Sequence, residues 1–192
     1  KRHGEGKEWH ENGQLKEHGM WVNGKRHGEV KQWYETGQLR IQYMFADNKQ
    51  HGISKTFYEN GQLRVHGTRI DGKRNGVFKN WFENGQLKAQ CSWIDDKENG
   101  EAKYWFENGQ LRMQTTWVNG KQNGKAKEWY EDGQLKSVGT WIDGTSNGES
   151  KYWYSNGQLN GQATFVNGKE NGESKVWYEN GQLWSVPWLM VS

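Results

Sequence analysis

Apolar and polar residues alternate along this chain in short runs that are separated by glycine-containing turns. In residues 29–31 and 39–43 the two kinds of side chain alternate at every position. Period-two alternation is typical of a β-strand with one packed face. Asn-Gly between two such runs, as at Asn12-Gly13, predicts a hairpin closed by a tight type I′ turn. No stretch without glycine is long enough for a stable helix.

The same unit recurs along the whole chain. Gly-Gln-Leu begins at Gly13, Gly37, Gly61, Gly85, Gly109, Gly133, Gly157 and Gly181, a step of 24 residues without insertion or deletion. A fixed period of this length is the signature of a repeat architecture. Each repeat is predicted to be strand, tight turn, strand and a longer loop such as residues 23–28. Residues 1–192 are therefore predicted to be one all-β array of eight hairpin repeats, an antiparallel meander of sixteen short strands.

A two-residue turn at positions 36–37 predicts the cross-strand pairs 34:39, 33:40, 32:41, 31:42 and 30:43. One face then carries Tyr34, Leu39, Val30 and Phe45 and is predicted to be packed. It has small residues in other repeats at the position of Tyr43, namely Gly19, Gly67, Gly139 and Ala163. The other face carries Trp33, Lys31, Arg40 and Glu29. A β-bulge would exchange part of this assignment.

Composition adds that the core must be thin and aromatic. Only 32% of the residues are apolar, but 13 Trp, 8 Tyr and 6 Phe are present. Large rings bury roughly 150–250 Å² each, so ladders of rings can replace a deep aliphatic core. The 26 basic and 23 acidic residues nearly balance, which disfavours a nucleic acid partner. Cys91 is the only cysteine, which excludes an intrachain disulfide. No apolar run reaches membrane-spanning length.

The candidate binding surface is a stripe of aromatic and basic residues on the second face. Its predicted members are Trp9, Trp33, Trp81, Trp105, Trp129, Trp153, Trp177, Lys31, Lys55, Lys79, Lys103, Lys127, Lys151, Arg40, Arg64 and Arg112. The functional interpretation is a ligand surface; the structural one is that long basic stems cover the tryptophan rings. Glutamates on the same face, namely Glu5, Glu29, Glu101, Glu149 and Glu173, are expected to neutralise part of the stripe.

The sequence predicts no metal, no cofactor and no enzymatic activity. His3, His27 and His51 recur one period apart, but equivalent residues of successive hairpins lie ~9.5 Å apart, too far to share a metal. Later repeats have Asn at this position, as in Asn75, which indicates turn geometry instead. No nucleophile and base stand out from the periodic background.

The segments Gly19-Met-Trp-Val-Asn-Gly-Lys-Arg-His-Gly28 and Gly139-Thr-Trp-Ile-Asp-Gly144 resemble the MORN repeat. The other half of the repeat, of the form Trp-Tyr-Glu-Asn-Gly-Gln-Leu-Lys, is similar to the bacterial MORN variant, often labelled a YwqK-like antitoxin repeat. The resemblance spans the whole chain and points to a bacterial source. It implies a single-layer, twisted and curved antiparallel sheet, an elongated trough. It also implies a scaffold or protein-binding role without chemistry.

Both ends of the chain depart from the pattern. Residues 184–192 abandon the repeat and include Pro187, the only proline. We interpret them as a C-terminal cap, with a docking segment as the alternative. The chain begins within a repeat at Lys1, without Met, which indicates a processed or excised product. An uncapped N-terminal edge would allow end-to-end self-association.

Together these features predict a non-enzymatic scaffold or protein-binding module. Its partner is expected to be a protein or peptide, extended or multivalent, that lies along the aromatic and basic face. One alternative is binding to membrane phospholipid or to a cell-surface polymer such as a glycan. Another is an antitoxin or immunity protein that occludes one toxin.

Overall fold

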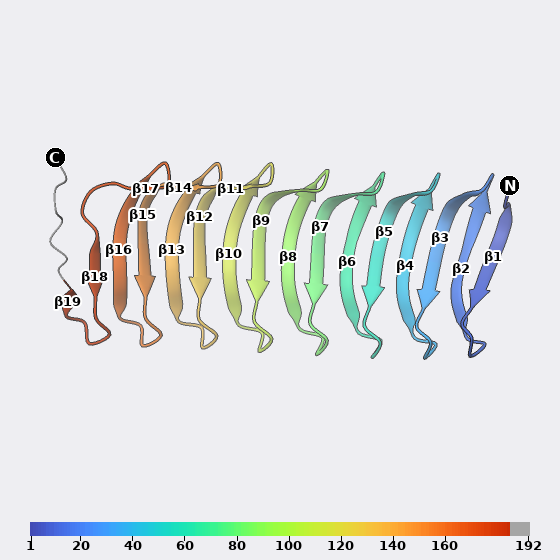
Figure 1. Cartoon of the computed structure of the whole chain (residues 1–192), viewed down its shortest axis with the longest axis horizontal. Coiled ribbons are helices and arrows are strands. Elements are labelled where there is room, and N and C mark those ends of the chain that lie inside the picture. The colour runs from blue at the N-terminus through green and yellow to red at the C-terminus, as the bar shows by residue number, and fades with distance from the viewer. Residues whose placement is uncertain (185–192) are drawn as a thin grey trace. The chain divides into compact units, whose positions relative to one another are not determined.

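The computed structural model describes residues 1–184, which contain nineteen β-strands and no helix (Figure 1). All the strands belong to one antiparallel sheet, in which neighbouring strands along the sequence pair with each other; where a strand is interrupted, both of its parts pair with the strand before it. The predicted all-β meander is therefore confirmed. The part of the chain described here contains no helix of the length and apolarity needed to cross a membrane. The predicted C-terminal cap lies, beyond Trp184, outside the described residues.

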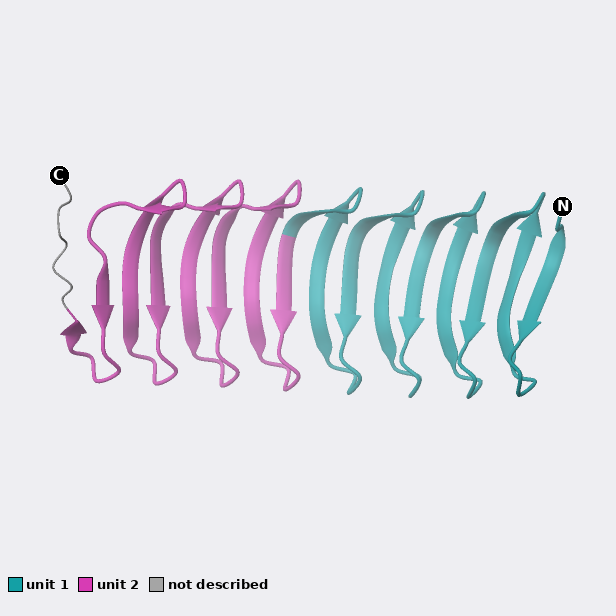
Figure 2. Cartoon of the chain, viewed as in Figure 1, with its two compact units in different colours: residues 1–100 teal, residues 101–192 magenta. Residues whose placement is uncertain are grey.

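The chain divides into two compact units at residue 100 (Figure 2). The strands of unit 1, residues 1–100, are β1 (Gly4–Trp9), β2 (Leu15–Val22), β3 (Lys25–Trp33), β4 (Leu39–Ala46), β5 (Lys49–Phe57), β6 (Leu63–Ile70), β7 (Lys73–Trp81), β8 (Leu87–Ile94) and the beginning of β9 (Lys97–Trp105). Each of β1 to β7 pairs with the strand that follows it.

Unit 2, residues 101–192, continues the same pattern. Its further strands are β10 (Leu111–Val118), β11 (Lys121–Gln122), β12 (Gly124–Trp129), β13 (Leu135–Ile142), β14 (Thr145–Ser146), β15 (Gly148–Trp153), β16 (Leu159–Val166), β17 (Lys169–Glu170), β18 (Lys175–Trp177) and β19 (Leu183–Trp184). Three of the predicted long strands are interrupted here, at Asn123, at Asn147 and around Asn171. These interruptions explain why the sixteen predicted strands become nineteen.

The two kinds of turn are the reverse of the prediction. The tight type I′ turns occur at the connection that was expected to be a longer loop: Asn23 and Gly24 both have positive φ, 51° and 84°. At the other connection only the glycine does, as in Gly37 with φ 85°. There the Tyr34 N–H donates to Gln38 O at 2.9 Å and the Gly37 N–H donates to Tyr34 O at 2.9 Å, which makes a three-residue loop.

This exchange also corrects part of the predicted register. The pairs 30:43, 31:42 and 32:41 are present, but a β-bulge follows and Trp33 lies opposite Leu39. The predicted pairs 33:40 and 34:39 are therefore wrong. The bulge arises because the loop has three residues, so that two residues of β4, Leu39 and Arg40, face one residue of β3.

The packed face, called the core face below, is the one that carries Gly19 and Val30, as predicted. Val30 is 2% exposed, and Phe78, Ala102 and Ala126 at the same position of later repeats are also buried. Small residues alternate with larger ones across the strands. A Cβ on Gly19 would lie 2.9 Å from Val30 Cγ2, and one on Gly67 would overlap the Phe78 ring. The thin core therefore depends on close packing between neighbouring strands.

Side chains also tie each repeat to the next one. Tyr34 Oη donates to Phe57 O at 2.8 Å, and Tyr58 Oη donates to Trp81 O at the same distance. Asn12 Nδ2 donates to Glu35 O at 2.8 Å, while Asn12 Oδ1 accepts from the Gln14 N–H at 3.0 Å. The asparagine bonds recur at Asn60, two periods later, and link neighbouring turns of the array.

Candidate binding surface

The face opposite the core face carries a row of lysines, one per repeat, which we call the lysine row: Lys7, Lys31, Lys55, Lys79, Lys103, Lys127, Lys151 and Lys175. In unit 1 the residues that lie directly opposite them on the intervening strands are His18, Gln42, His66 and Gln90. In unit 2 they are Gln114, Val138 and Gln162. The register therefore aligns the predicted lysines of each unit in one line across its strands.

Most of these lysines are neutralised by a glutamate two residues earlier on the same strand. Lys31 Nζ lies 2.7 Å from Glu29 Oε2, and Gln42 Nε2 on the next strand donates to Glu29 Oε1 at 2.5 Å. We call this group the glutamate clamp. The pair of glutamate and lysine recurs at Glu5, Glu101, Glu149 and Glu173 with distances of 2.9–3.5 Å, and the glutamine bond recurs at Glu101 and Glu149. The prediction that these glutamates neutralise part of the stripe is confirmed.

The clamp also shifts the titration of its carboxyl group. The hydrogen bond from Lys31, followed by that from Gln42, holds the pKa of Glu29 below its ordinary value. Lys103 and Gln114 lower the pKa of Glu101 in the same way. Because the charged form of the glutamate is favoured, the clamp keeps its negative charge beside the lysine.

Three lysines of the row have no clamp. The residue two places earlier is Ile53 before Lys55, Val77 before Lys79 and Lys125 before Lys127. Among residues 1–184, none of these three lysines has an ion pair. The positive charge of the lysine row is therefore concentrated in two places, one in each unit.

In unit 1 the unclamped site is centred on His66. This residue lies opposite Lys55 on one side and opposite Lys79 on the other. Burial, and then the charges of Lys55 and Lys79, lower the pKa of His66. Ile53 and Val77 replace the glutamates beside it, and each is 49% exposed. The surface is therefore basic and apolar at once.

In unit 2 the unclamped site is a shallow hollow. It has a volume of about 250 Å³ and is lined by Gln114, Thr116, Lys125 and Lys127. Both lysines are exposed, and Lys125 replaces the glutamate of the clamp by a residue of opposite charge. An anionic group in this hollow would meet two ammonium groups and two polar side chains.

The predicted tryptophans do not share an environment with the predicted arginines. Trp33, Trp81, Trp105, Trp129, Trp153 and Trp177 are half-buried, and only Trp9 of the column is exposed, at 58%. Because of the bulge, Arg40 lies over the ring of Tyr34, 5.7 Å from its centroid, and Arg64 lies over Tyr58 at 5.5 Å. The expected cross-strand pairing of each tryptophan with a basic residue is therefore wrong. Arg112 is exposed.

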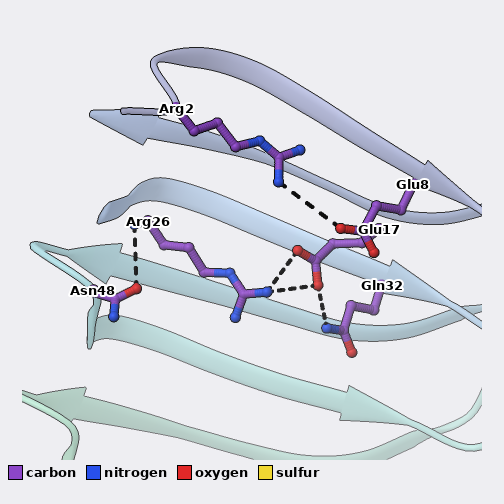
Figure 3. A network of polar contacts seen from close by, with 6 residues as sticks. All are labelled: Arg2, Glu8, Glu17, Arg26, Gln32 and Asn48. Atoms are coloured by element: carbon purple, nitrogen blue, oxygen red, sulfur yellow. Dashed lines mark hydrogen bonds and ion pairs between the residues drawn. The ribbon is translucent and has the colours of Figure 1, made fainter. Parts of the chain in front are cut away.

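The sequence analysis placed Phe45 on the packed face but did not recognise the second aromatic column to which it belongs, namely Trp21, Phe45, Trp93, Trp117, Trp141 and Phe165. In unit 1 arginines cover it. The guanidinium carbon of Arg2 lies 3.7 Å from the Trp21 ring centroid, and Arg26 lies opposite Trp21 in the ladder. Arg26 Nη2 donates to both carboxylate oxygens of Glu17, at 2.7 and 3.0 Å (Figure 3). The recurrence of arginine nineteen residues before a ring was the signal that could have revealed this.

The histidine column gathers no metal site in the described part of the chain, where no group of three or more potential ligands occurs. His18 instead contacts Glu5 at 2.5 Å, in the place of the clamp glutamine, and His10 Nε2 lies 3.0 Å from Trp33 O. These histidines take part in the contacts between strands and between repeats.

The comparisons agree with the repeat boundaries. The family described as the MORN repeat variant matches residues 2–23, 26–47, 50–71, 74–95, 98–119, 122–143, 146–167 and 170–186. Comparison with curated protein sequences gives no match.

Proposed function

Since the chain belongs to the MORN repeat variant family, a repeat consistent with a non-enzymatic binding module, we propose that it binds acidic segments of a partner protein through the unclamped lysines. The observation that carries this proposal is the replacement of the clamp glutamate by Ile53, Val77 and Lys125. Lys31 and Lys103 already have a carboxylate at 2.7 and 2.9 Å, whereas Lys55, Lys79 and Lys127 lack one among the described residues.

The spacing of the unit 1 site fits an extended segment. Lys55 and Lys79 lie two strands apart, which corresponds to ~9.5 Å. In a polyproline II conformation, which is extended and has three residues per turn, residues three positions apart are separated by about 9.3 Å and point to the same side. Acidic residues at every third position can therefore reach both lysines, while apolar side chains between them contact Ile53 and Val77. These exposed apolar neighbours favour a polypeptide over a nucleic acid, whose backbone offers phosphates only.

The half-buried tryptophan column lies on the same face of the sheet as the lysine row, two residues further along each strand. We propose that its rings chiefly stiffen the sheet, and that Trp9, with its exposed ring, is the member best placed to meet a ligand. Arg40 and Arg64, which lie over Tyr34 and Tyr58, add positive charge near the turns.

The test is fluorescence anisotropy with a labelled peptide that has Glu at every third position and Thr elsewhere. A matched peptide with Gln in place of Glu is the control ligand. The wild-type chain is expected to bind the Glu peptide at least about tenfold more tightly than the Gln peptide, with an affinity that falls as salt rises. Equal binding of the two peptides contradicts the proposal.

Restoring the clamp is the complementary test. In the double variant Ile53→Glu/Val77→Glu, each new carboxylate neutralises its lysine, and affinity is expected to fall about tenfold. Ile142→Glu, which adds a negative charge at a half-exposed apolar position of unit 2, is the single-charge control.

The other functions are outcomes of the same experiment. Binding to anionic phospholipid vesicles or to a cell-wall glycan without binding to the Glu peptide would favour a membrane or polymer role. An antitoxin or immunity protein of the YwqK-like kind would use this surface on a single toxin. Relief of growth arrest on co-expression with that toxin would identify such a role.

A further inference from the structure

The core face of unit 2 contains a cavity of about 350 Å³, whose lining also includes Lys127 of the lysine row and Val138 opposite it. Its lining includes Trp141 and Phe165, which occupy adjacent places in the second aromatic column. Ala126, Gly139 and Ser150, successive small residues across three strands, also line it. Alternation along β15 places Ser150 and Lys151 on opposite faces of the sheet. The small residues and aromatic rings of the cavity therefore lie on the face opposite the proposed surface, and Lys127 is the residue of that surface that also lines the cavity.

In unit 1 the side chain of Arg26 fills the position that is equivalent to this cavity. Five repeats before Trp141 and Phe165 stand Trp21 and Phe45, and Arg26 lies between them in the sequence. Arg26 is directly opposite Trp21, its guanidinium carbon lies 5.8 Å from the Phe45 ring centroid, and it is anchored on Glu17. Gln32 Nε2 completes this half-buried group with a hydrogen bond of 2.6 Å to Glu17 (Figure 3).

In unit 2 the arginine and its carboxylate are both replaced by serine. Ser146 stands at the position of Arg26, opposite Trp141, and Ser137 stands at that of Glu17. Both serines line the cavity. The hollow therefore occupies the place that corresponds to the Arg26 side chain, five repeats further along.

Trp141 has also lost its other arginine neighbour. Arg2 stacks on Trp21 at 3.7 Å, but the corresponding residue for Trp141 is Gln122, whose Nε2 donates to Thr115 Oγ1 at 2.8 Å. Within residues 1–184 no Arg or Lys lies over the ring of Trp141 or Phe165. These two rings keep the negative faces that guanidinium groups cover in unit 1.

The polar atoms of the lining suit a guanidinium group. Glu128 contributes a carboxylate, with Lys136 Nζ 3.2 Å from its Oε1, and Ser137, Ser146 and Ser150 contribute hydroxyl groups. A planar cation with several N–H donors can lie between the rings and donate to these oxygens. A single carboxylate that already has one lysine partner favours a monovalent cation.

We propose that this cavity binds an arginine side chain of a partner polypeptide, which takes the place that Arg26 occupies in unit 1. The proposed arginine site requires no acidic ligand. Its test can therefore fail or succeed whatever the outcome for the proposed function. The site would let the two faces of the repeat array recognise residues of opposite charge.

The probe for this site is N-acetyl-L-arginine amide, followed through the Trp141 indole N–H signal in ¹H–¹⁵N spectra. The signal is assigned from the spectrum of Trp141→Phe. The neutral analogue N-acetyl-L-citrulline amide, which has nearly the same shape, is the control ligand. We expect saturable shifts of Trp141 with the arginine probe and at least about tenfold weaker binding of the citrulline probe. Equal binding of the two probes, or no shift of Trp141 with either, overturns the proposal.

Variants that introduce the unit 1 residues into the cavity of unit 2 provide the second test. Ser146→Arg supplies the missing side chain from within, and we expect it to weaken binding of the arginine probe at least about tenfold. Ser150→Val, which introduces the residue found at Val30, narrows the cavity without adding charge and should also weaken binding. Ser155→Arg adds the same charge at an exposed turn and should bind as the wild type does. Wild-type affinity in both Ser146→Arg and Ser150→Val contradicts the assignment.

Discussion

The guanidinium carbon of Arg74 lies 3.4 Å from the centroid of the Trp93 ring, and Arg74 Nε donates to Asp96 Oδ1 at 2.8 Å. The arginine thus joins a ring of the core face to the type I′ turn that follows it. In a sheet with so thin a core, such a contact replaces some of the apolar burial that a thicker domain would provide.

Removal of the Arg74 side chain is therefore expected to destabilise the chain. Arg74→Ala loses the stacking on Trp93 and the bond to Asp96, and we expect a loss of about 1–2 kcal/mol in the free energy of unfolding. Arg74→Lys keeps the charge but not the planar stacking group and should lose about half as much. Urea denaturation followed by tryptophan fluorescence measures both. A loss no larger for Ala than for Lys would show that the ring contact contributes nothing.

The close approach of Gly67 to Phe78 makes a second prediction. A methyl group on Gly67 overlaps the Phe78 ring, so Gly67→Ala should cost about 1–3 kcal/mol of stability. Gly161→Ala is the matched control, because a Cβ there meets no atom closer than 3.6 Å. Equal stability of the two variants, measured by thermal unfolding, would mean that the strands separate easily at Gly67.

The hydrogen bonds that tyrosines make between successive repeats lead to a third prediction. Tyr58→Phe removes the donor to Trp81 O, and the expected loss is about 0.5–1.5 kcal/mol. Tyr152, which is 45% exposed, provides the control Tyr152→Phe. Hydrogen exchange at the amides of residues 81–86 should accelerate in Tyr58→Phe only. Unchanged hydrogen exchange at these amides would show that the Tyr58 hydrogen bond does not hold successive repeats together.

The sequence was sufficient to predict the strands and the buried position of Val30, because both follow from a local pattern repeated eight times. It was not sufficient to distinguish the two turns, since Asn-Gly occurs at both. The Asn12 side chain binds the Glu35 carbonyl of the next repeat, a contact 23 residues away that the local pattern does not reveal. The lysine row was predicted for the same reason as the strands. The arginines that cover the second aromatic column were not predicted. Each of them contacts a ring on another strand, and that contact can be found only once the register of the strands is known.

The pKa of Glu101 gives a prediction with a defined sign. Lys103, and then Gln114, lower it in the folded chain relative to the unfolded chain. The clamp's contribution to stability is therefore present above the ordinary carboxyl pKa of about 4.3 and is lost as the pH falls through the depressed value. In Lys103→Met the pKa of Glu101, followed by carboxyl-carbon NMR, should rise toward its ordinary value. An unchanged pKa would show that Lys103 does not hold the carboxylate.

His66 reports most directly on the proposed binding surface, because it lies between the unclamped Lys55 and Lys79. Burial and the two lysines lower its pKa, so it binds its proton less readily in the folded chain, and stability is expected to fall as the pH drops below about 6.5. An acidic ligand on the two lysines would reverse part of this shift. The decisive measurement is the pKa of His66 by NMR with and without the Glu peptide. We expect a higher pKa of His66 in the complex and no such change with the Gln peptide; an identical pKa with saturating Glu peptide would contradict binding at Lys55 and Lys79.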